Sequence, residues 1–77
     1  MQTLAELVSS TEPIAGPTSS FLARRLRLAA GVTQAEAAEA VGVSTRTISN
    51  WESARTAPAE RLRRRYRAYL SVLAGGL

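Results

Sequence analysis

The fold is decided by residues 33–54, which read TQAEAAEAVGVSTRTISNWESA. Two short helical segments meet here across Gly42-Val43-Ser44, so the turn between them has three or four residues and begins with glycine. Glycine suits this place because the chain needs a positive φ, which a residue without a Cβ adopts at little cost. Two helices joined by such a turn cross at a steep angle. The stretch therefore predicts a helix-turn-helix.

The first helix of the motif is predicted over residues 34–41. Thr33 is its N-cap, and Glu36 completes the Thr-x-x-Glu spacing of a capping box. Gly42 ends it, as glycine commonly does just after a helix.

The second helix of the motif is predicted over residues 45–54, with Ser44 as its N-cap. Ile48 and Trp51 are three residues apart, so they share a face of this helix. We expect that pair, with Val43, to hold the second helix against the rest of the domain.

Two longer helices flank the motif. The one before it is predicted over residues 19–30 and ends at Gly31. The one after it begins at Pro58, a residue favoured in the first turn, and runs to Ala74. Each carries apolar residues at helical spacing, which predicts a buried face. The N-cap candidates of the earlier helix are Thr18, Ser19 and Ser20; the stripes are Leu22, Leu26 and Ala29 in the earlier helix and Leu62, Tyr66, Tyr69, Leu70 and Leu73 in the later one.

A short acidic segment precedes these helices. A helix over residues 4–9 is predicted from the capping-box spacing of Thr3 and Glu6. Two prolines and a glycine then interrupt it, which predicts a linker. The chain thus divides into an N-terminal extension and linker, residues 1–17, and a helix-turn-helix domain with a long C-terminal helix, residues 18–77. The extension is interpreted as loosely docked or as a functional arm.

The composition restricts both fold and chemistry. The 77 residues include ten Arg and six Glu but no Asp, Lys, His or Cys. Without histidine or cysteine the chain lacks the usual soft metal ligands, thiol nucleophiles and imidazole bases, so we expect no enzyme, no metal and no cofactor. Alanine is abundant and aromatic residues make up only 5% of the chain, which favours an all-α fold.

The charge favours a polyanionic partner. The formal net charge is +4, and most of the arginines lie in residues 24–27 and 61–67. A nucleic acid, an acidic membrane surface and an acidic protein all satisfy this balance. No stretch is long and apolar enough to span a membrane, and no targeting segment is visible, so we expect a soluble cytoplasmic protein.

A combination of short motifs surrounds the turn and is far more specific than any one of them. The motifs are Leu26-Arg27, Gly31-Val32-Thr33-Gln34, Ala37-Ala38, Val41-Gly42-Val43-Ser44, Ile48-Ser49-Asn50-Trp51-Glu52 and Pro58. Through them residues 22–58 resemble the phage-repressor and Cro-type helix-turn-helix family, also called the XRE family. The resemblance implies a compact bundle of four core helices, to which this chain adds the short N-terminal helical extension.

The chain departs from the family's pattern in three places. Ala37 stands where the family usually has leucine, which predicts a thinner core. Ala54 replaces the glycine common after the second helix of the motif, so the end of that helix is expected to shift. The family's short fourth and fifth helices are fused into one Arg-rich helix, so the family's dimer geometry is not assumed.

The resemblance implies that the second helix of the motif lies in the major groove of DNA, with its N-terminal residues at the base edges. Arg46 suits a bidentate contact with guanine, and Asn50 suits one with adenine. A phosphate contact or a solvated side chain is the alternative for Arg46. Thr45 and Ser49 are expected to contact a thymine methyl group or a phosphate.

Contacts with the DNA backbone are expected from Gln34, Ser53, Arg55 and Thr56. Gln34 opens the first helix of the motif, and a helix N-terminus favours an anion. The alternative for Gln34 is that it caps its own helix. Arg55 follows the second helix directly, and an exposed arginine without a partner is its alternative interpretation.

Arg27 and Glu52 are given a structural role by the same resemblance. Similar proteins pair the equivalent positions as a partly buried ion pair that joins the first core helix to the recognition helix. The arginines of residues 61–67 have three interpretations: a solvated helix face, phosphate contacts along the flank of the DNA, or a dimer surface. The last rests on the apolar stripe of that helix, which exceeds what a thin core needs.

Together these features predict a small transcriptional regulator that binds specific sequences of double-stranded DNA. A repressor that occludes its operator is expected, as a homodimer with recognition helices ~34 Å apart. The alternative is the antitoxin of a toxin–antitoxin pair that also binds DNA and contacts a protein partner through residues 1–17. A DNA-bending factor has less support, because no wedge residue for the minor groove stands out.

Overall fold

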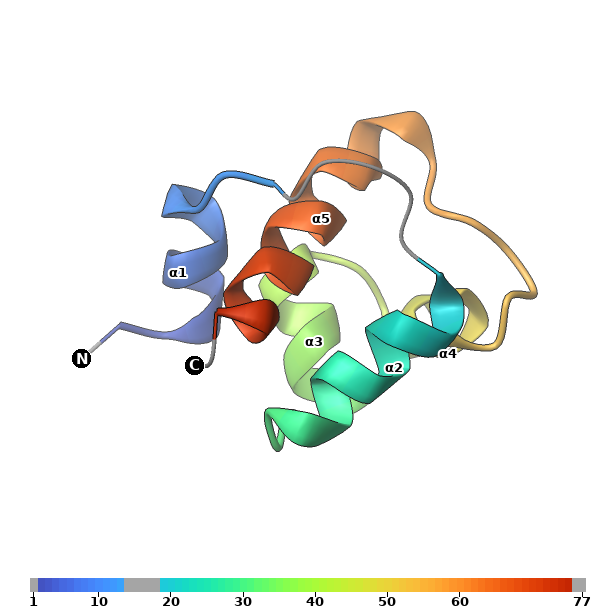
Figure 1. Ribbon diagram of the computed structural model, residues 1–77. Helices are drawn as coiled ribbons and strands as arrows, with labels where there is room; N and C mark the ends of the chain where they lie inside the picture. The colour runs from blue at the N-terminus through green and yellow to red at the C-terminus, as the bar shows by residue number, and fades with distance from the viewer. Residues whose placement is uncertain (1, 14–18, 76–77) are drawn as a thin grey trace.

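Capping residues and apolar spacing produce five α-helices in the computed structural model, which describes residues 2–13 and 19–75 (Figure 1). No strand occurs in this part of the chain, so the all-α prediction is confirmed. Most of the predicted linker (residues 14–17) and the cap candidate Thr18 lie outside the described residues. The helices are α1 Leu4–Ser10, α2 Ser20–Ala29, α3 Gln34–Val41, α4 Thr45–Glu52 and α5 Glu60–Ala74.

Helix α3 has the predicted bounds because both of its ends are fixed by local contacts. The Thr33 hydroxyl accepts a hydrogen bond from the Glu36 amide at 3.1 Å, and the Glu36 carboxylate accepts one from the Thr33 amide at 2.9 Å. Hydrogen bonds to the Glu36 carboxylate from the backbone and the side chain of Thr33 lower the pKa of Glu36 below its ordinary value. At the other end Gly42 has a φ of 85°, which gives the turn its sharp start.

The predicted junction between α4 and α5 is wrong by two residues on each side. Helix α4 ends at Glu52 rather than residue 54, because Ala54 takes a φ of 62° and reverses the chain. The Arg55 amide then donates to the Asn50 carbonyl at 2.9 Å, closing the helix in the pattern usual for a terminal glycine. Helix α5 begins at Glu60 rather than at Pro58, with Ala59 as a cap that offers no side-chain hydrogen bond.

The helices pack around α5, with α1 against one side and α2 against another (Figure 1). Helix α3 contacts α1, α4 and α5, so it joins the helix-turn-helix to the rest of the core. Every helix contributes to this core; its most deeply buried large side chains are Val8, Val41, Ile48, Tyr69 and Leu70. The N-terminal helix therefore completes the same core as the four others.

The buried face of α2 differs from the predicted one. Leu22 is 46% exposed and Ala29 is also exposed, whereas Ala23 and Arg27 are buried. Helix α2 faces inward along the side that carries Arg27, because this side chain reaches Glu52 on α4. Of the predicted stripe only Leu26 is partly buried and packs against the core, so the prediction of this face is correct at one of its three residues. The large apolar side chains left exposed on α2 are Phe21, Leu22 and Leu28.

The apolar stripe of α5 is buried as predicted, but it is not a dimer surface. Helices α1, α2 and α3 all pack against α5, so the apolar stripe of α5 is covered within the domain itself. The interpretation of this stripe as an interface between two copies is therefore wrong. Its buried members are Tyr66, Tyr69, Leu70 and Leu73, and Leu62 is partly buried.

Arg65 fits none of the three interpretations of the Arg-rich segment. Its side chain is partly buried, and its Nε donates to the carbonyl of Ala40 at 3.1 Å. Its Nη1 donates to the Ser9 hydroxyl at 3.3 Å. Arg65 therefore joins α5 to the end of α3 and to α1, while Arg61, Arg63 and Arg64 remain exposed.

Candidate nucleic-acid interface

Helix α4 is held by its inner face and presents its outer face to solvent. Ser44 caps it by accepting a hydrogen bond from the Thr47 amide at 3.1 Å. Ile48 is 0% exposed, and Trp51 packs against Tyr66 of α5 with ring centroids 4.7 Å apart. These contacts determine which side of the helix points outward.

The four predicted base-contacting residues lie together on that outer face. Thr45, Arg46 and Ser49 are exposed, and Asn50 is half-buried beside them. Their positions i, i+1, i+4 and i+5 cover one side of the helix. The side chains of Arg46 and Asn50 make no hydrogen bond with the described residues, so the donors and acceptors that suit guanine and adenine remain available.

Arg27 and Glu52 form a bidentate ion pair between α2 and α4. Arg27 Nε lies 2.7 Å from Glu52 Oε2, and Nη2 lies 2.9 Å from Oε1. The remaining Nη1 donates to the carbonyl of Val32 at 3.0 Å, so this arginine also holds the chain that leads into α3. The hydrogen bond to Glu52 raises the pKa of Arg27, although burial acts against it. The two elements of the site are thus joined by a buried ion pair.

Gln34 extends this network into α3. Its side chain is half-buried, and Nε2 donates to Glu52 Oε1 at 3.3 Å. The alternative that Gln34 caps its own helix is wrong, because Thr33 and Glu36 form the cap. Gln34 therefore lies at the N-terminus of α3 with its position fixed by the same carboxylate that binds Arg27.

A polar hollow brings the candidate residues of three helices together. It has a volume of about 280 Å³. One exposed residue of the hollow, Arg24, has no role in the sequence-based prediction. The spacing of three between Arg24 and Arg27 places both on one side of α2, and this was the available signal. The residues that line the hollow are Arg24, Arg27, Gln34, Ser49, Glu52 and Ser53.

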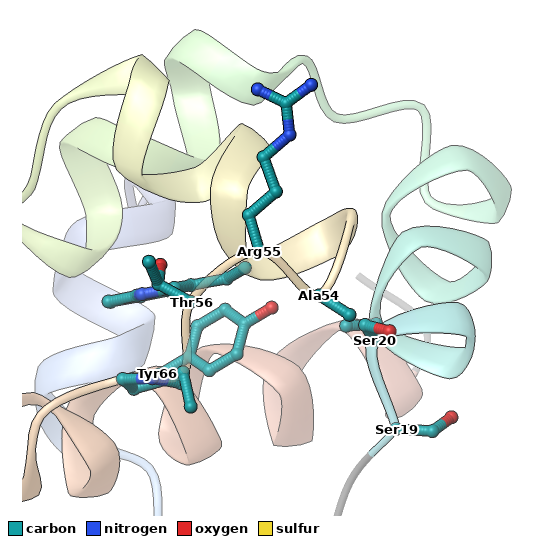
Figure 2. Close-up of a pocket in the computed structure, with 10 residues that line it drawn as sticks. Ser19, Ser20, Ala54, Arg55, Thr56 and Tyr66 are labelled. Carbon is teal, nitrogen blue, oxygen red and sulfur yellow. The ribbon is translucent and has the colours of Figure 1, made fainter.

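The residues that follow α4 differ in whether their side chains are free to donate a hydrogen bond to a phosphate. The Ser53 hydroxyl donates to the carbonyl of Ser49 at 2.9 Å, so a phosphate contact requires it to rotate away. Arg55 and Thr56 are exposed in the loop between α4 and α5. Figure 2 shows the Arg55 side chain pointing away from the pocket beneath this loop.

The described part of the chain has neither a cluster of metal-ligand side chains nor a membrane-spanning helix. No three His, Cys, Asp or Glu side chains there come together as a metal site would require. None of the helices there has the length and apolar character needed to cross a membrane.

Comparison with known protein families gives one match. A family model described as helix-turn-helix matches residues 24–64, just over half of the chain, from Arg24 through the motif to Arg64. The comparison with curated proteins gave no significant match, nor did the comparison with solved structures. The matched segment contains α3, the turn, α4 and the ion pair that holds them. The chain belongs to the Cro/XRE-type helix-turn-helix family of DNA-binding transcription regulators.

Proposed function

We propose that the protein represses transcription by binding specific operator sequences as a homodimer, with α4 in the major groove. The observation that carries the proposal is the outer face of α4, where four polar side chains stand together while Ile48 and Trp51 anchor the helix. A helix presented in this way fits the major groove, where each base pair displays a distinct pattern of donors and acceptors.

Arg46 and Asn50 are the residues that distinguish sequences in this proposal. A guanidinium matches the O6 and N7 acceptors of guanine, and a carboxamide matches adenine. Each good bidentate contact discriminates against the wrong base by about 1–3 kcal/mol. Thr45 and Ser49 flank them and contact a thymine methyl group or a phosphate.

The backbone contacts come from both sides of α4. Gln34 and Arg24 approach from the hollow beside Ser49, and Arg55 and Thr56 approach from the loop that follows α4. Such contacts set the position of the protein on the duplex without reading sequence. The Arg27–Glu52 pair contributes indirectly, because it fixes α4 and Gln34 relative to α2.

Repression follows because the bound protein occupies the operator. Two protomers related by a two-fold axis place their recognition helices about 34 Å apart, one turn of the duplex, on a near-palindromic operator. A dimer bound in this way excludes other proteins from the same stretch of DNA. We place this activity in the cytoplasm and assign the protein no enzymatic function.

The dependence of DNA binding on salt tests the phosphate contacts. Arg24 and Arg55 are the two cations of the proposed set, so the slope of log K against log[salt] for a dimer is expected to be about −4. The Arg24→Gln variant should reduce the magnitude of that slope by about 2 per dimer. Arg25→Gln is the matched control, because this neighbour lies over the Phe21 ring at 5.7 Å and outside the hollow.

Fluorescence anisotropy on a labelled duplex measures these slopes. A total slope near −2 would contradict the proposed set of phosphate contacts. If the slope changes equally in the Arg24→Gln and Arg25→Gln variants, Arg24 makes no phosphate contact. The change in slope is then an effect of net charge alone.

A further inference from the structure

The large apolar side chains that the described part of the chain exposes all lie on α2. They are Phe21, Leu22 and Leu28, with exposed fractions of 69%, 46% and 58%. Phe21 and Leu28 are seven residues apart, so they share one side of the helix, and Arg25 lies between them. We call Phe21, Arg25 and Leu28 the α2 stripe. Exposed apolar side chains gathered on one element mark a contact with another molecule.

Arg25 gives the α2 stripe a positive charge. Its guanidinium lies over the Phe21 ring, 5.7 Å from the ring centroid, so the ring and the charge are presented together. Arg25 is exposed and has no carboxylate partner among the described residues. The α2 stripe therefore suits a surface that offers an apolar hollow beside carboxylates.

The same chain carries such a surface between α1 and α3. A groove of about 360 Å³ lies there, within the ~300–1,000 Å³ range of pockets that hold organic molecules, so it has room for an aromatic ring. Both of its carboxylates, Glu36 and Glu39, belong to exposed residues, and neither has a cationic partner in the described part of the chain. The residues that line the groove are Thr3, Leu4, Ala5, Glu36, Glu39 and Ala40.

The α2 stripe and the α1–α3 groove lie on different parts of the molecule. Helix α1 packs mainly against α3 and α5, whereas α2 packs mainly against α4 and α5 (Figure 1). A stripe that points from α2 into solvent therefore meets this groove on another copy of the chain. Neither surface includes a residue proposed to contact DNA, so the outer face of α4 remains free.

We propose that the α2 stripe of one copy docks in the α1–α3 groove of a second copy. The Phe21 ring enters the groove against Leu4 and Ala5, and Arg25 pairs with Glu39. Because the two surfaces differ, the contact is heterologous: every copy that joins leaves a stripe or a groove free, and copies add head to tail. This contact differs from a two-fold dimer, in which both copies use the same surface, so it joins neighbouring dimers.

The contact is weak in solution and is favoured on DNA. An aromatic anchor contributes ~150–250 Å² of buried area, whereas a stable interface buries ~1,200–2,000 Å². Copies that are bound side by side on one duplex meet at a high effective concentration. The consequence is cooperative binding to adjacent operators, and this consequence rests on the proposed function.

Two variants isolate a single contact. Phe21→Ser removes the anchor of the α2 stripe and keeps the groove, while Glu39→Lys removes a carboxylate of the groove and keeps the stripe. Both positions are exposed, so neither substitution disturbs the core. In a mixture, the intact stripe of the Glu39→Lys variant can bind only the intact groove of the Phe21→Ser variant.

¹H–¹⁵N NMR of one labelled variant titrated with the other, unlabelled, tests the contact without DNA. The labelled Phe21→Ser variant should show saturable shifts at residues 3–5 and 36–40 but not on α2. The labelled Glu39→Lys variant should show them at residues 21–28 instead. The proposal is overturned if neither titration gives saturable shifts. Shifts at the same residues in both titrations, as in a two-fold contact, would also overturn it.

A second substitution in the labelled Phe21→Ser variant tests the charge of the groove. Adding Glu39→Lys there should weaken binding of the unlabelled partner about tenfold, as expected when a main contact of an interface is lost. Adding Glu60→Lys is the matched control, because Glu60 is exposed on α5 and does not line the groove. Equal weakening by the two additions would overturn the pairing of Arg25 with the groove.

Titration of duplexes that carry one operator, or two in tandem at a series of spacings, tests the consequence on DNA. At one or more spacings the wild-type protein should fill the paired operators at a several-fold lower concentration than the single one. The Phe21→Ser variant should fill both duplexes at the same concentration. Equal cooperativity in the two proteins overturns the role on DNA and leaves the NMR result intact. A protein that binds no DNA under any condition overturns the proposed function, and the NMR titrations still decide the contact.

Discussion

At the scale of single residues, the arrangement of the site depends most on the buried Arg27–Glu52 pair. Two charges are removed from water there, and their desolvation is offset by two direct hydrogen bonds and by the further bonds to Val32 and Gln34. The resemblance of the sequence to a known family indicated this pair. The link to Gln34 needed the structure, because it depends on how α3 and α4 lie against each other. For Arg24 the sequence offered only its spacing of three from Arg27.

Removing one partner of the pair should be worse than removing both. We expect Arg27→Met or Glu52→Leu alone to lower the free energy of unfolding by about 3–5 kcal/mol, because a buried charge is left uncompensated. The double variant should lose less than the sum of the two single losses. Urea unfolding of the three variants measures this coupling. Strictly additive losses would show that the pair does not act as a unit.

The two buried tyrosines should make the protein sensitive to alkali. Burial raises the pKa of Tyr66 to about 12, and it raises the pKa of Tyr69 as well. The folded state therefore keeps both phenols protonated where the unfolded state has already lost its protons. Their contribution to stability is present below pH ~10 and is lost as the pH rises toward 12.

The Tyr66→Phe/Tyr69→Phe double variant should retain its melting temperature between pH 10 and 12 better than the wild type. At pH 7 it should be at least as stable, because the two buried hydroxyls that it removes have no partner among the described residues. Circular dichroism melts from pH 7 to 11.5 check both expectations. Parallel curves for variant and wild type would refute the assignment of the alkaline loss to these phenols.

At the scale of the elements, helix ends could be predicted where a local signal fixes them. The Thr33–Glu36 capping box and Gly42 gave the bounds of α3 directly. The end of α4 was missed because the sequence has alanine where glycine would mark the turn. The start of α5 was missed because neither Ala57 nor Ala59 offers a capping side chain, so the start is not set by a local cap.

Substitutions at Gly42 and Ala54, the residues with positive φ after α3 and α4, should change the stability of the protein in opposite directions. Gly42 and Ala54 both have positive φ, a conformation that costs an L-residue with a Cβ about 1–2 kcal/mol. Ala54→Gly should therefore stabilise the protein by about 1 kcal/mol.

Gly42→Ala should destabilise it by a similar amount for conformational reasons alone, because an added Cβ meets no atom within 4 Å. Midpoints of urea unfolding compare both variants with the wild type. A loss of stability in Ala54→Gly would mean that the αL turn after α4 carries no strain.

At the scale of the whole molecule, the N-terminal helix is part of the domain's core. Val8 is buried against the other helices, and Arg65 reaches Ser9 from α5. The wide apolar stripe of α5 already indicated that something covers it. Local patterns could not identify α1 as the cover, because that contact depends on the path of the chain between α1 and α2.

Val8→Ala should therefore lower the free energy of unfolding by about 1–3 kcal/mol, through lost burial and an unfilled cavity. DNA affinity per folded molecule should not change, since Val8 lies in the core and α1 packs mainly against α3 and α5. Gln2→Ala, at an exposed position before α1, is the control and should alter neither quantity. Unchanged stability in Val8→Ala would show that α1 does not support the core.

Selection of bound sequences from a pool of random duplexes tests the central claim, that α4 reads DNA bases. The wild-type protein should recover an inverted repeat whose half-sites are centred about one turn of the duplex apart. Arg46→Ala should relax specificity at a guanine and Asn50→Ala at an adenine, at different positions of the half-site. Recovery of no motif, or the same motif from all three proteins, would contradict base reading by α4.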